Sequence, residues 1–170
     1  MIGCGGLGQL ATQYAKALGC KVVGIDINDD ILAQCKAQGA DAVFNSMTNK
    51  SYVEELLKLT GGGVKTAAVF SNADAAYAGA PLIIKNGGVL MVVGLPHNPL
   101  KISSMDLALG KYKVKSESTS IPQRMGKAVE FTAKYNIRPE VGLKYSLDDV
   151  QGMVTEMQGG KNIKRMAVVF

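Results

Sequence analysis

The chain has 170 residues, of which 47% are apolar and 19% are charged, and its formal net charge is +5. This composition excludes a disordered chain and allows one domain with a substantial core. No run approaches the ~18 consecutive apolar residues of a membrane span and no charged leader precedes an apolar stretch, so we expect a soluble, cytoplasmic protein without a membrane partner.

The positive charge is concentrated in residues 101–144, which hold nine Lys/Arg against four Asp/Glu. Within this range Lys111, Lys113 and Lys115 alternate along a predicted strand. Such a stripe could bind a polyanion, but lysines also protect the edge strand of a sheet from pairing with other chains. We favour the protected edge and expect no nucleic-acid partner.

A glycine-rich segment opens the chain, with Gly3, Gly5 and Gly8 at the spacing G-x-G-x-x-G. Gly3 allows a tight turn out of a strand, Gly5 lets a pyrophosphate approach the backbone, and Gly8 lets the next helix lie close to the sheet. The N-terminus of that helix offers unpaired N–H groups and a partial positive charge to the phosphates.

The residues after this segment supply the rest of a nucleotide-binding unit. Apolar residues recur at helical spacing over 10–18, including Leu18, and Gly19 is placed to end that helix. Residues 21–26 are typical of a buried strand that ends in Asp26, eighteen residues beyond the last motif glycine. An acid near this spacing binds a ribose hydroxyl, so we predict a dinucleotide site rather than a structural turn.

Helices and strands are predicted to alternate through the next hundred residues. We expect a helix from Asn28 or Asp29 to Gly39, a strand at 41–44, and a helix opened by a Ser51–Glu54 capping box and ended at 61–63. A strand at 66–70, a helix capped by Asn72 or Asp74, a turn at 86–88 and a strand at 89–93 follow. After a short helix near 107–109 and a strand at 112–117, we expect a helix from Pro122 to about Tyr135, with Met125, Ala128, Val129 and Thr132 on one face. With Met1–Ile2 as a shortened first strand, this alternation predicts an α/β fold with a doubly wound parallel sheet of order 3-2-1-4-5-6.

The C-terminal residues break the alternation. Residues 137–145 are expected to be extended, 147–157 helical and 166–170 a strand, which together form a strand–helix–strand tail. We therefore divide the chain into a dinucleotide-binding domain, 1–136, and a tail, 137–170. Because the tail strands are apolar and need partners, we expect a marginally stable chain that self-associates or forms a homo-oligomer.

Five segments occur together in a characteristic order: Gly3–Gly19, Val-Val-Gly-Ile-Asp at 22–26, Gly39-Ala-Asp41, Val92-Val-Gly-Leu95 and Lys164–Phe170. This ordered set resembles the medium-chain, zinc-dependent alcohol dehydrogenases. The resemblance covers nearly the whole chain, and it corresponds to the C-terminal portion of such an enzyme, from the middle of its first nucleotide-binding strand. It implies a Rossmann fold, NAD as cofactor, and hydride transfer between NAD and a primary or secondary alcohol or aldehyde.

The resemblance also implies roles for individual residues. The pyrophosphate would be held by Gly3, Gly5, Gly6, Leu7 and Gly8, the adenosine ribose by Asp26, and the nicotinamide by Val93, Gly94 and Leu95. Arg165 corresponds to an arginine that family members direct at the pyrophosphate, and its alternative is a surface charge.

The family's catalytic zinc polarises the substrate oxygen, and its ligands come from a preceding domain. The single histidine, His97, has no cysteine or carboxylate at ligand spacing, and we interpret it as a loop residue. The cysteines are too far apart in sequence for a disulfide framework or a Cys-x-x-Cys site: Cys4, Cys20 and Cys35. We therefore predict no metal ligand and no catalytic residue, and expect zinc only in a catalytic domain missing from this chain.

The resulting prediction is the NAD-binding domain of an alcohol-dehydrogenase-like oxidoreductase, with little or no turnover as an isolated chain. A non-catalytic NAD-binding sensor or scaffold is the alternative, which the missing metal ligands favour. A methyltransferase also follows a glycine segment with an acid, but the position of Gly8 inside the helix argues against it.

Overall fold

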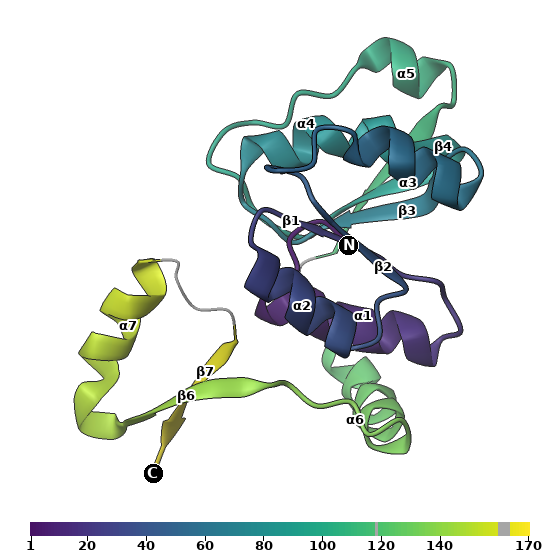
Figure 1. Ribbon diagram of the computed structural model, residues 1–170. Coiled ribbons are helices and arrows are strands. Elements are labelled where there is room, and N and C mark those ends of the chain that lie inside the picture. The colour runs from purple at the N-terminus through teal and green to yellow at the C-terminus, as the bar shows by residue number, and fades with distance from the viewer. Residues whose placement is uncertain (118, 160–163) are drawn as a thin grey trace.

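The structure is a computed structural model that describes residues 1–117, 119–159 and 164–170 (Figure 1). The helices are α1 (Gly6–Ala17), α2 (Asp29–Ala37), α3 (Tyr52–Thr60), α4 (Asp74–Ile83), α5 (Ser104–Ala108), α6 (Met125–Lys134) and α7 (Val150–Gln158), with 3-10 turns η1 (Pro122–Arg124) and η2 (Leu147–Asp149). The strands are β1 (Val23–Asp26), β2 (Ala42–Asn45), β3 (Val64–Val69), β4 (Ile84–Val92), β5 (Tyr112–Ser116), β6 (Val141–Ser146) and β7 (Arg165–Val169). The predicted α/β class with parallel strands is confirmed.

Strands β1 to β5 belong to the larger lobe of the molecule, which also holds α1 to α5. They form two parallel groups that meet at Ile2. One group pairs β1 with β2, and the other runs in the order β3-β4-β5. Ile2 bridges to Ile25 of β1 and to Val69 of β3, and both bridges are parallel. Its backbone N–H donates to Ala68 O at 2.8 Å and its carbonyl accepts from Phe70 N at 2.8 Å. On the β1 side, Ile25 N donates to Met1 O at 2.8 Å and Gly3 N donates to Ile25 O at 2.9 Å, so the short segment 1–3 connects the two groups.

Two hydrophobic clusters lie on opposite faces of these strands, because α1 and α2 cover one face and α3 and α4 the other (Figure 1). The larger cluster joins Leu56 of α3 and Ile83 of α4 to strand residues such as Val69. The smaller one joins Leu32 and Cys35 of α2 to residues that include Cys4, Val22 and Ala40. Burial of a large apolar side chain stabilises a fold by about 1.5–3 kcal/mol, so these clusters hold the lobe together.

Several predicted helix boundaries are confirmed. Asn28 caps α2, since its side chain accepts from Ile31 N at 3.1 Å. Gly19 and Gly61 follow α1 and α3 with φ of +78° and +66°, a conformation that glycine adopts without steric cost.

The Ser51–Glu54 capping box is wrong. Ser51 precedes α3 with ψ of 6° rather than the extended conformation of a capping residue, and its side chain makes no cap. Asn49 organises this entry instead: its side chain accepts from Ser51 N at 2.9 Å and donates to Glu55 at 3.1 Å.

The predicted caps of α4 are also wrong, because both side chains bond elsewhere. Asn72 accepts from Leu95 N at 3.0 Å, and Asp74 accepts from the Asn98 amide at 2.6 Å. The residue before α4 is Ala73, whose N–H donates to the Ser71 hydroxyl at 3.1 Å. The two polar side chains thus tie α4 to the segment after β4.

The predicted turn at 86–88 is a bulge inside β4. Val64 pairs with Ile84, but Thr66 already pairs with Val89, so β4 holds extra residues over the same length of β3. Gly87, at φ +75°, absorbs this irregularity.

Two predicted apolar faces are more exposed than expected. Leu18 is 68% exposed, and α1 buries Gly8, Gln9 and Thr12 instead, because its glycines bring the helix backbone close to the strands. Met125 and Val129 of α6 are likewise exposed.

Helix α6 contacts α1 through its C-terminal turns, where Thr132 lies on the same predicted face as Met125 and Val129. The Tyr14 hydroxyl and the Thr132 hydroxyl are 2.6 Å apart, and the Tyr14 and Phe131 rings stack at 6.0 Å. These contacts fix the C-terminal part of α6 to α1, while Met125 and Val129 nearer its start stay exposed.

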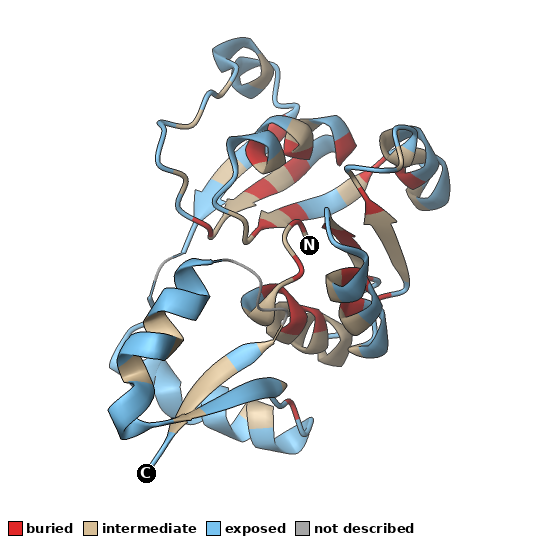
Figure 2. Ribbon diagram, turned by 60° about the vertical axis from the view of Figure 1, so that its left-hand side comes forward, coloured by how far each residue is buried: buried red, intermediate tan, exposed pale blue. Residues whose placement is uncertain are grey.

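The tail forms a small parallel unit that lies to one side of the larger lobe (Figure 1). β6 pairs with β7, and α7 lies between them in sequence. Glu140 accepts from Lys164 at 2.5 Å and from the Gln38 amide of the larger lobe at 3.3 Å. None of the described residues from Arg138 onward is buried (Figure 2).

In the part of the chain that the structure describes, no helix has the length and apolar character that a membrane crossing requires.

Candidate dinucleotide-binding site

The glycine loop connects Ile2 to α1 at the carboxyl ends of the strands. Gly3 has φ of +84°, and its N–H donates to Ile25 O at 2.9 Å. A Cβ on Gly8 would lie 2.2 Å from Gly3 O, so a side chain there would push apart the two ends of the loop. Both glycines are therefore needed for the loop itself.

Gly5 has a different environment. It precedes α1 as the capping residue, yet no described side chain caps this helix and its first turn carries no acid. A Cβ on Gly5 would meet nothing within 4 Å among the described atoms. At Gly5 the start of α1 thus faces open space, and the N–H groups of a first helical turn have no acceptor within the helix, which fits the pyrophosphate of a dinucleotide.

Asp26, at the end of β1, is held against this loop. One carboxylate oxygen accepts from Cys4 N at 2.7 Å, and the other accepts from Ile27 N at 2.7 Å and Asn28 N at 3.2 Å. A carboxylate has about four acceptor positions, so capacity for a ribose hydroxyl remains. Sequence spacing predicted the place of Asp26 but not its bond to the loop.

The predicted nicotinamide residues follow β4 and lie beside the same loop. Val93 N and Gly94 N both donate to Val69 O, at 3.1 and 2.8 Å. A Cβ on Gly94 would lie 2.3 Å from Ser71 O, and one on Gly3 would lie 2.8 Å from Ser71 N. The two glycines therefore flank the chain that leaves β3, while Leu95 is 73% exposed.

Tyr77 of α4 supports this segment, although the sequence analysis did not single it out. Its buried hydroxyl donates to Gly94 O, and burial raises the pKa of that hydroxyl. The sequence offers one signal for this contact. It is a tyrosine on an otherwise apolar helix face, followed by a glycine at the end of the next strand.

Arg165 of β7 reaches the glycine loop from the tail. A Cβ on Gly6 would lie 2.5 Å from Arg165 Cδ, so the arginine stem covers this glycine. Gly6 and Leu7 begin α1, and Leu7 is 52% exposed.

The structure thus brings all ten predicted residues to the carboxyl ends of the strands, where Ile2 separates β1 from β3. A parallel sheet binds ligands at such a switch point.

Potential metal ligands do not gather at this place. Among residues 1–117, 119–159 and 164–170, no group of three or more His, Cys, Asp or Glu side chains could hold a metal ion. His97 is exposed in an irregular segment after β4. Cys4 and Cys35 are buried, whereas Cys20 is exposed.

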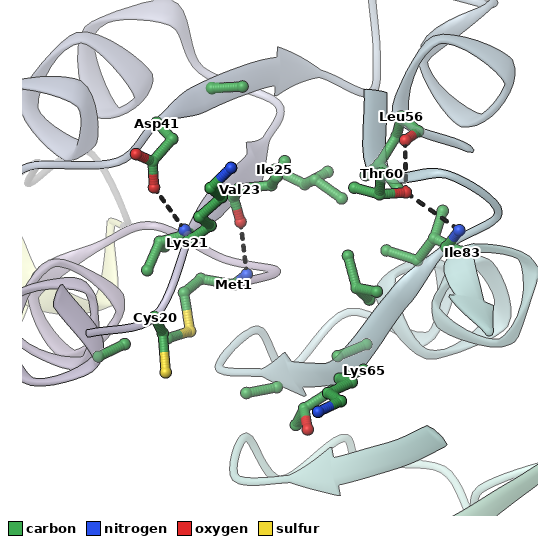
Figure 3. A pocket seen from close by; sticks show the side chains of 18 of the residues that line it. Met1, Cys20, Lys21, Val23, Ile25, Asp41, Leu56, Thr60, Lys65 and Ile83 are labelled. Atoms are coloured by element: carbon green, nitrogen blue, oxygen red, sulfur yellow. Dashed lines mark hydrogen bonds between the residues drawn. The ribbon is translucent and has the colours of Figure 1, made fainter. Parts of the chain in front are cut away.

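A pocket of about 720 Å³ lies elsewhere, between β1 and β3 on the far side of Ile2 from the glycine loop. Figure 3 shows Val23 on one side of it and Thr60 and Ile83 on the other. None of the predicted site residues lines it. This pocket is therefore not the candidate dinucleotide site.

Solved structures of the same fold span about twice the length of this chain. The alcohol dehydrogenase from the archaeon Aeropyrum pernix is 23% identical with a TM-score of 0.86, over 97% of this chain and 47% of its own. Benzyl alcohol dehydrogenase from Acinetobacter calcoaceticus is 22% identical with a TM-score of 0.83, over 99% and 48%. L-idonate 5-dehydrogenase from Escherichia coli is 19% identical with a TM-score of 0.83, over 99% and 49%. At such identities the likeness establishes a Rossmann-like fold.

The family is established by sequence. Residues 6–134 match the zinc-binding dehydrogenase family, over its NAD-binding portion. That stretch holds Gly6, Leu7, Gly8, Asp26 and the segment after β4, whereas Gly3, Gly5 and Arg165 of the candidate site lie outside it. The family implies NAD as the cofactor. This chain therefore belongs to the zinc-binding dehydrogenases.

Proposed function

We propose that the chain is the NAD-binding domain of an alcohol-dehydrogenase-like oxidoreductase, which transfers hydride between NAD and a primary or secondary alcohol or aldehyde. The observation that carries the proposal is the uncapped N-terminus of α1, which faces open space at Gly5 beside the fixed carboxylate of Asp26. Membership in the dehydrogenase family supports the same function.

In this proposal each group of residues contacts one part of the cofactor. N–H groups at Gly5, Gly6 and Leu7 bind the pyrophosphate, with the Arg165 guanidinium beside it. Asp26 accepts from the adenosine ribose. Residues 93–95 contact the nicotinamide, because they lie at the carboxyl end of the neighbouring strand group. NAD supplies the hydride acceptor, and the protein residues orient and bind it.

Asp26 also favours NAD over NADP in this account. A 2′-phosphate would place negative charge against the carboxylate, which three backbone N–H groups already fix in position. No Lys or Arg occurs in residues 27–32 to offset that repulsion.

We further propose the strand order 3-2-1-4-5-6, in which Met1–Ile2 is strand 1, β1 and β2 are strands 2 and 3, and β3, β4 and β5 are strands 4, 5 and 6. We also propose a division into a dinucleotide-binding domain, 1–136, and a tail, 137–170. The bridges of Ile2 to Ile25 and Val69 support the order. The lack of burial among the described residues from Arg138 onward supports the division.

The isolated chain is expected to bind NAD without oxidising alcohols, and to purify without stoichiometric zinc. This expectation rests on the exposed position of His97 and on the scattered Cys, Asp and Glu side chains of the described residues. The same features suit the alternative function, a non-catalytic NAD sensor or scaffold. Elemental analysis and an alcohol-oxidation assay test the expectation, and one tightly bound zinc that is lost in His97→Ala would contradict it.

Two alanine substitutions test the binding function directly. Gly5→Ala adds a Cβ to open space, so the fold should keep its stability while NAD affinity falls at least about tenfold, since the methyl group occupies the pyrophosphate position. Gly8→Ala should lower both stability and affinity, because its Cβ meets Gly3 O. Calorimetric titration with NAD and thermal melting separate the two effects. Unchanged affinity in Gly5→Ala would contradict the proposal.

A further inference from the structure

Two glutamine side chains of the larger lobe contact the segment that leads into the tail. Gln13 of α1 donates to Arg138 O at 2.8 Å and accepts from Arg138 N at 3.2 Å, so it pairs with both backbone groups of one residue. Two residues further on, the Glu140 carboxylate accepts from the amide of Gln38, which follows α2, at 3.3 Å. The entry to β6 is therefore held from both α1 and α2.

Glu140 also connects this segment to the strand that carries Arg165. Its backbone carbonyl accepts from Arg165 N at 2.9 Å, and its carboxylate accepts from Lys164 at 2.5 Å. The Lys164 stem lies against Gly142 of β6, since a Cβ on that glycine would be 2.9 Å from Lys164 Cβ. The start of β7 is thus fixed to the entry of β6 by a backbone bond, an ion pair and packing.

Arg165 brings a positive charge to the glycine loop. Its Cδ and Nε would lie 2.5 and 3.8 Å from a Cβ on Gly6, and the residue is exposed. Within residues 1–117, 119–159 and 164–170, no carboxylate forms an ion pair with its guanidinium. The first turn of α1 has no acid either. The guanidinium therefore remains available to an anion at the start of α1, and its planar donors suit phosphate oxygens.

We propose that Gln13 and Glu140 are positioning residues for the dinucleotide, which hold the tail against the larger lobe so that Arg165 lies over the pyrophosphate position. The inference rests on the proposed function, because it takes the glycine loop as the pyrophosphate site. Neither positioning residue is among the ten predicted site residues, and the effect of each on affinity passes through Arg165.

The contacts that hold the tail make its docking sensitive to a ligand. They are polar, and none of the described residues from Arg138 onward is buried, so the tail opens at low cost in free energy. An anion that contacts Arg165 favours the docked tail. By thermodynamic reciprocity, each contact that favours the docked tail raises the affinity for that anion. Binding of NAD should therefore protect the tail, and loss of a positioning contact should weaken the binding of NAD.

Trypsin measures the docking through cleavage after Lys144, an exposed residue of β6. The full chain is digested with and without saturating NAD, and mass spectrometry follows this cut. NAD should slow it severalfold in the unaltered chain but not in Arg165→Ala. Without NAD, Gln13→Ala and Glu140→Gln should speed it, whereas Gln151→Ala, at an exposed glutamine of α7, should leave the rate unchanged.

Calorimetric titration with NAD then shows whether the positioning residues act through Arg165. Arg165→Ala should weaken binding about tenfold, since it removes a charged hydrogen bond to phosphate. Gln13→Ala and Glu140→Gln should each weaken it at least about threefold. In the Arg165→Ala background the same two substitutions should cause no further loss, because the group that they position is gone. A merely structural role would lower the affinity in both backgrounds.

Gln13 and Glu140 belong to different regions of the chain, so the two substitutions are independent tests, and thermal melting checks that each variant is folded. The inference is overturned if NAD leaves cleavage after Lys144 unchanged, or if the losses from Gln13→Ala and Arg165→Ala add. When the unaltered chain binds NAD and either result appears, the proposed function stands and the positioning role fails alone. When the unaltered chain does not bind NAD, both fail.

Discussion

The larger lobe and the tail are built from the same unit, parallel strands joined through a helix, but only the larger lobe has a core. In the lobe, helices cover both faces of the strands, and Leu56 and Val69 are fully buried. In the tail, β6 and β7 are accompanied by α7 alone, and no described residue after Ile137 is buried (Figure 2).

The difference teaches that an apolar strand pattern does not ensure burial. Leu143 of β6 is 40% exposed, although its strand pairs in parallel with β7, with one register shift between Val141 and Leu143. A two-stranded sheet is marginal alone, because its faces need further layers before apolar side chains leave water. Stability in this chain therefore resides in the larger lobe.

The largest expected effect comes from a matched pair of leucines. Leu56→Ala removes a fully buried side chain and should cost about 2–5 kcal/mol of unfolding free energy. Leu143→Ala, in the tail, should cost less than about 1 kcal/mol, because its side chain already contacts water. Urea denaturation followed by circular dichroism measures both. Equal losses would show that the tail shares the core.

Sequence reasoning predicted the elements of both regions well, and it located the candidate site. Glycine spacing and the acid after a strand lead directly to Gly3, Gly8 and Asp26, because these residues are required by local backbone geometry. The capping box at Ser51 failed because a side chain from Asn49 competes for the same backbone groups.

Tertiary partners explain what the sequence could not predict. The buried Thr12 of α1 and the exposed Leu18 depend on which helix face meets the strands. The bond from Tyr77 to Gly94 and the contact of Arg165 with Gly6 join residues whose proximity only the fold determines. Local patterns therefore gave the elements, and the packing decided which faces were covered.

Self-association should originate in the tail. Val141 and Leu143 lie two residues apart in β6 and are 38% and 40% exposed. Exposed apolar side chains of this kind favour contact between copies of the chain. Leu143→Lys should shift light scattering toward the monomer, whereas Leu82→Lys, at an exposed leucine of the larger lobe, should change it little. An unaltered chain that is strictly monomeric would contradict this expectation.

Limited proteolysis should separate the regions by order of cleavage. Trypsin is expected to cut after the exposed Lys144 before it cuts after Lys65 of β3, because the tail opens without disrupting a buried cluster. Mass spectrometry of early time points identifies the first cuts. A tail that resists trypsin longer than the larger lobe does would contradict this expectation.

The smallest effect concerns two carboxylates, one in each region. Lys16 and the Val22 N–H hold the pKa of Asp41 below its usual value, and Lys164 does the same for Glu140. Since both pKa values are lower in the folded state, their stabilisation is present near neutral pH and is lost as pH falls below about 4.

Asp41→Asn should therefore lower Tm slightly at pH 7, and by less as pH falls through the acid range in which Asp41 takes up its proton. Glu140→Gln should leave Tm unchanged and speed cleavage of the tail, because its partner Lys164 belongs to that region. Thermal melts over a series of pH values test the pair, and a Tm loss for Asp41→Asn that does not shrink as pH falls would exclude the electrostatic explanation.

The central claim is that the glycine loop and Asp26 bind NAD, and calorimetric titration of the unaltered chain with NAD and NADP tests it most directly. The account predicts binding of one NAD per chain with clear preference over NADP, and a relaxed preference in a variant that combines Asp26→Asn with Ile27→Arg, since Ile27 is exposed and adjacent. Absence of NAD binding, or equal affinity of the unaltered chain for both cofactors, would contradict it.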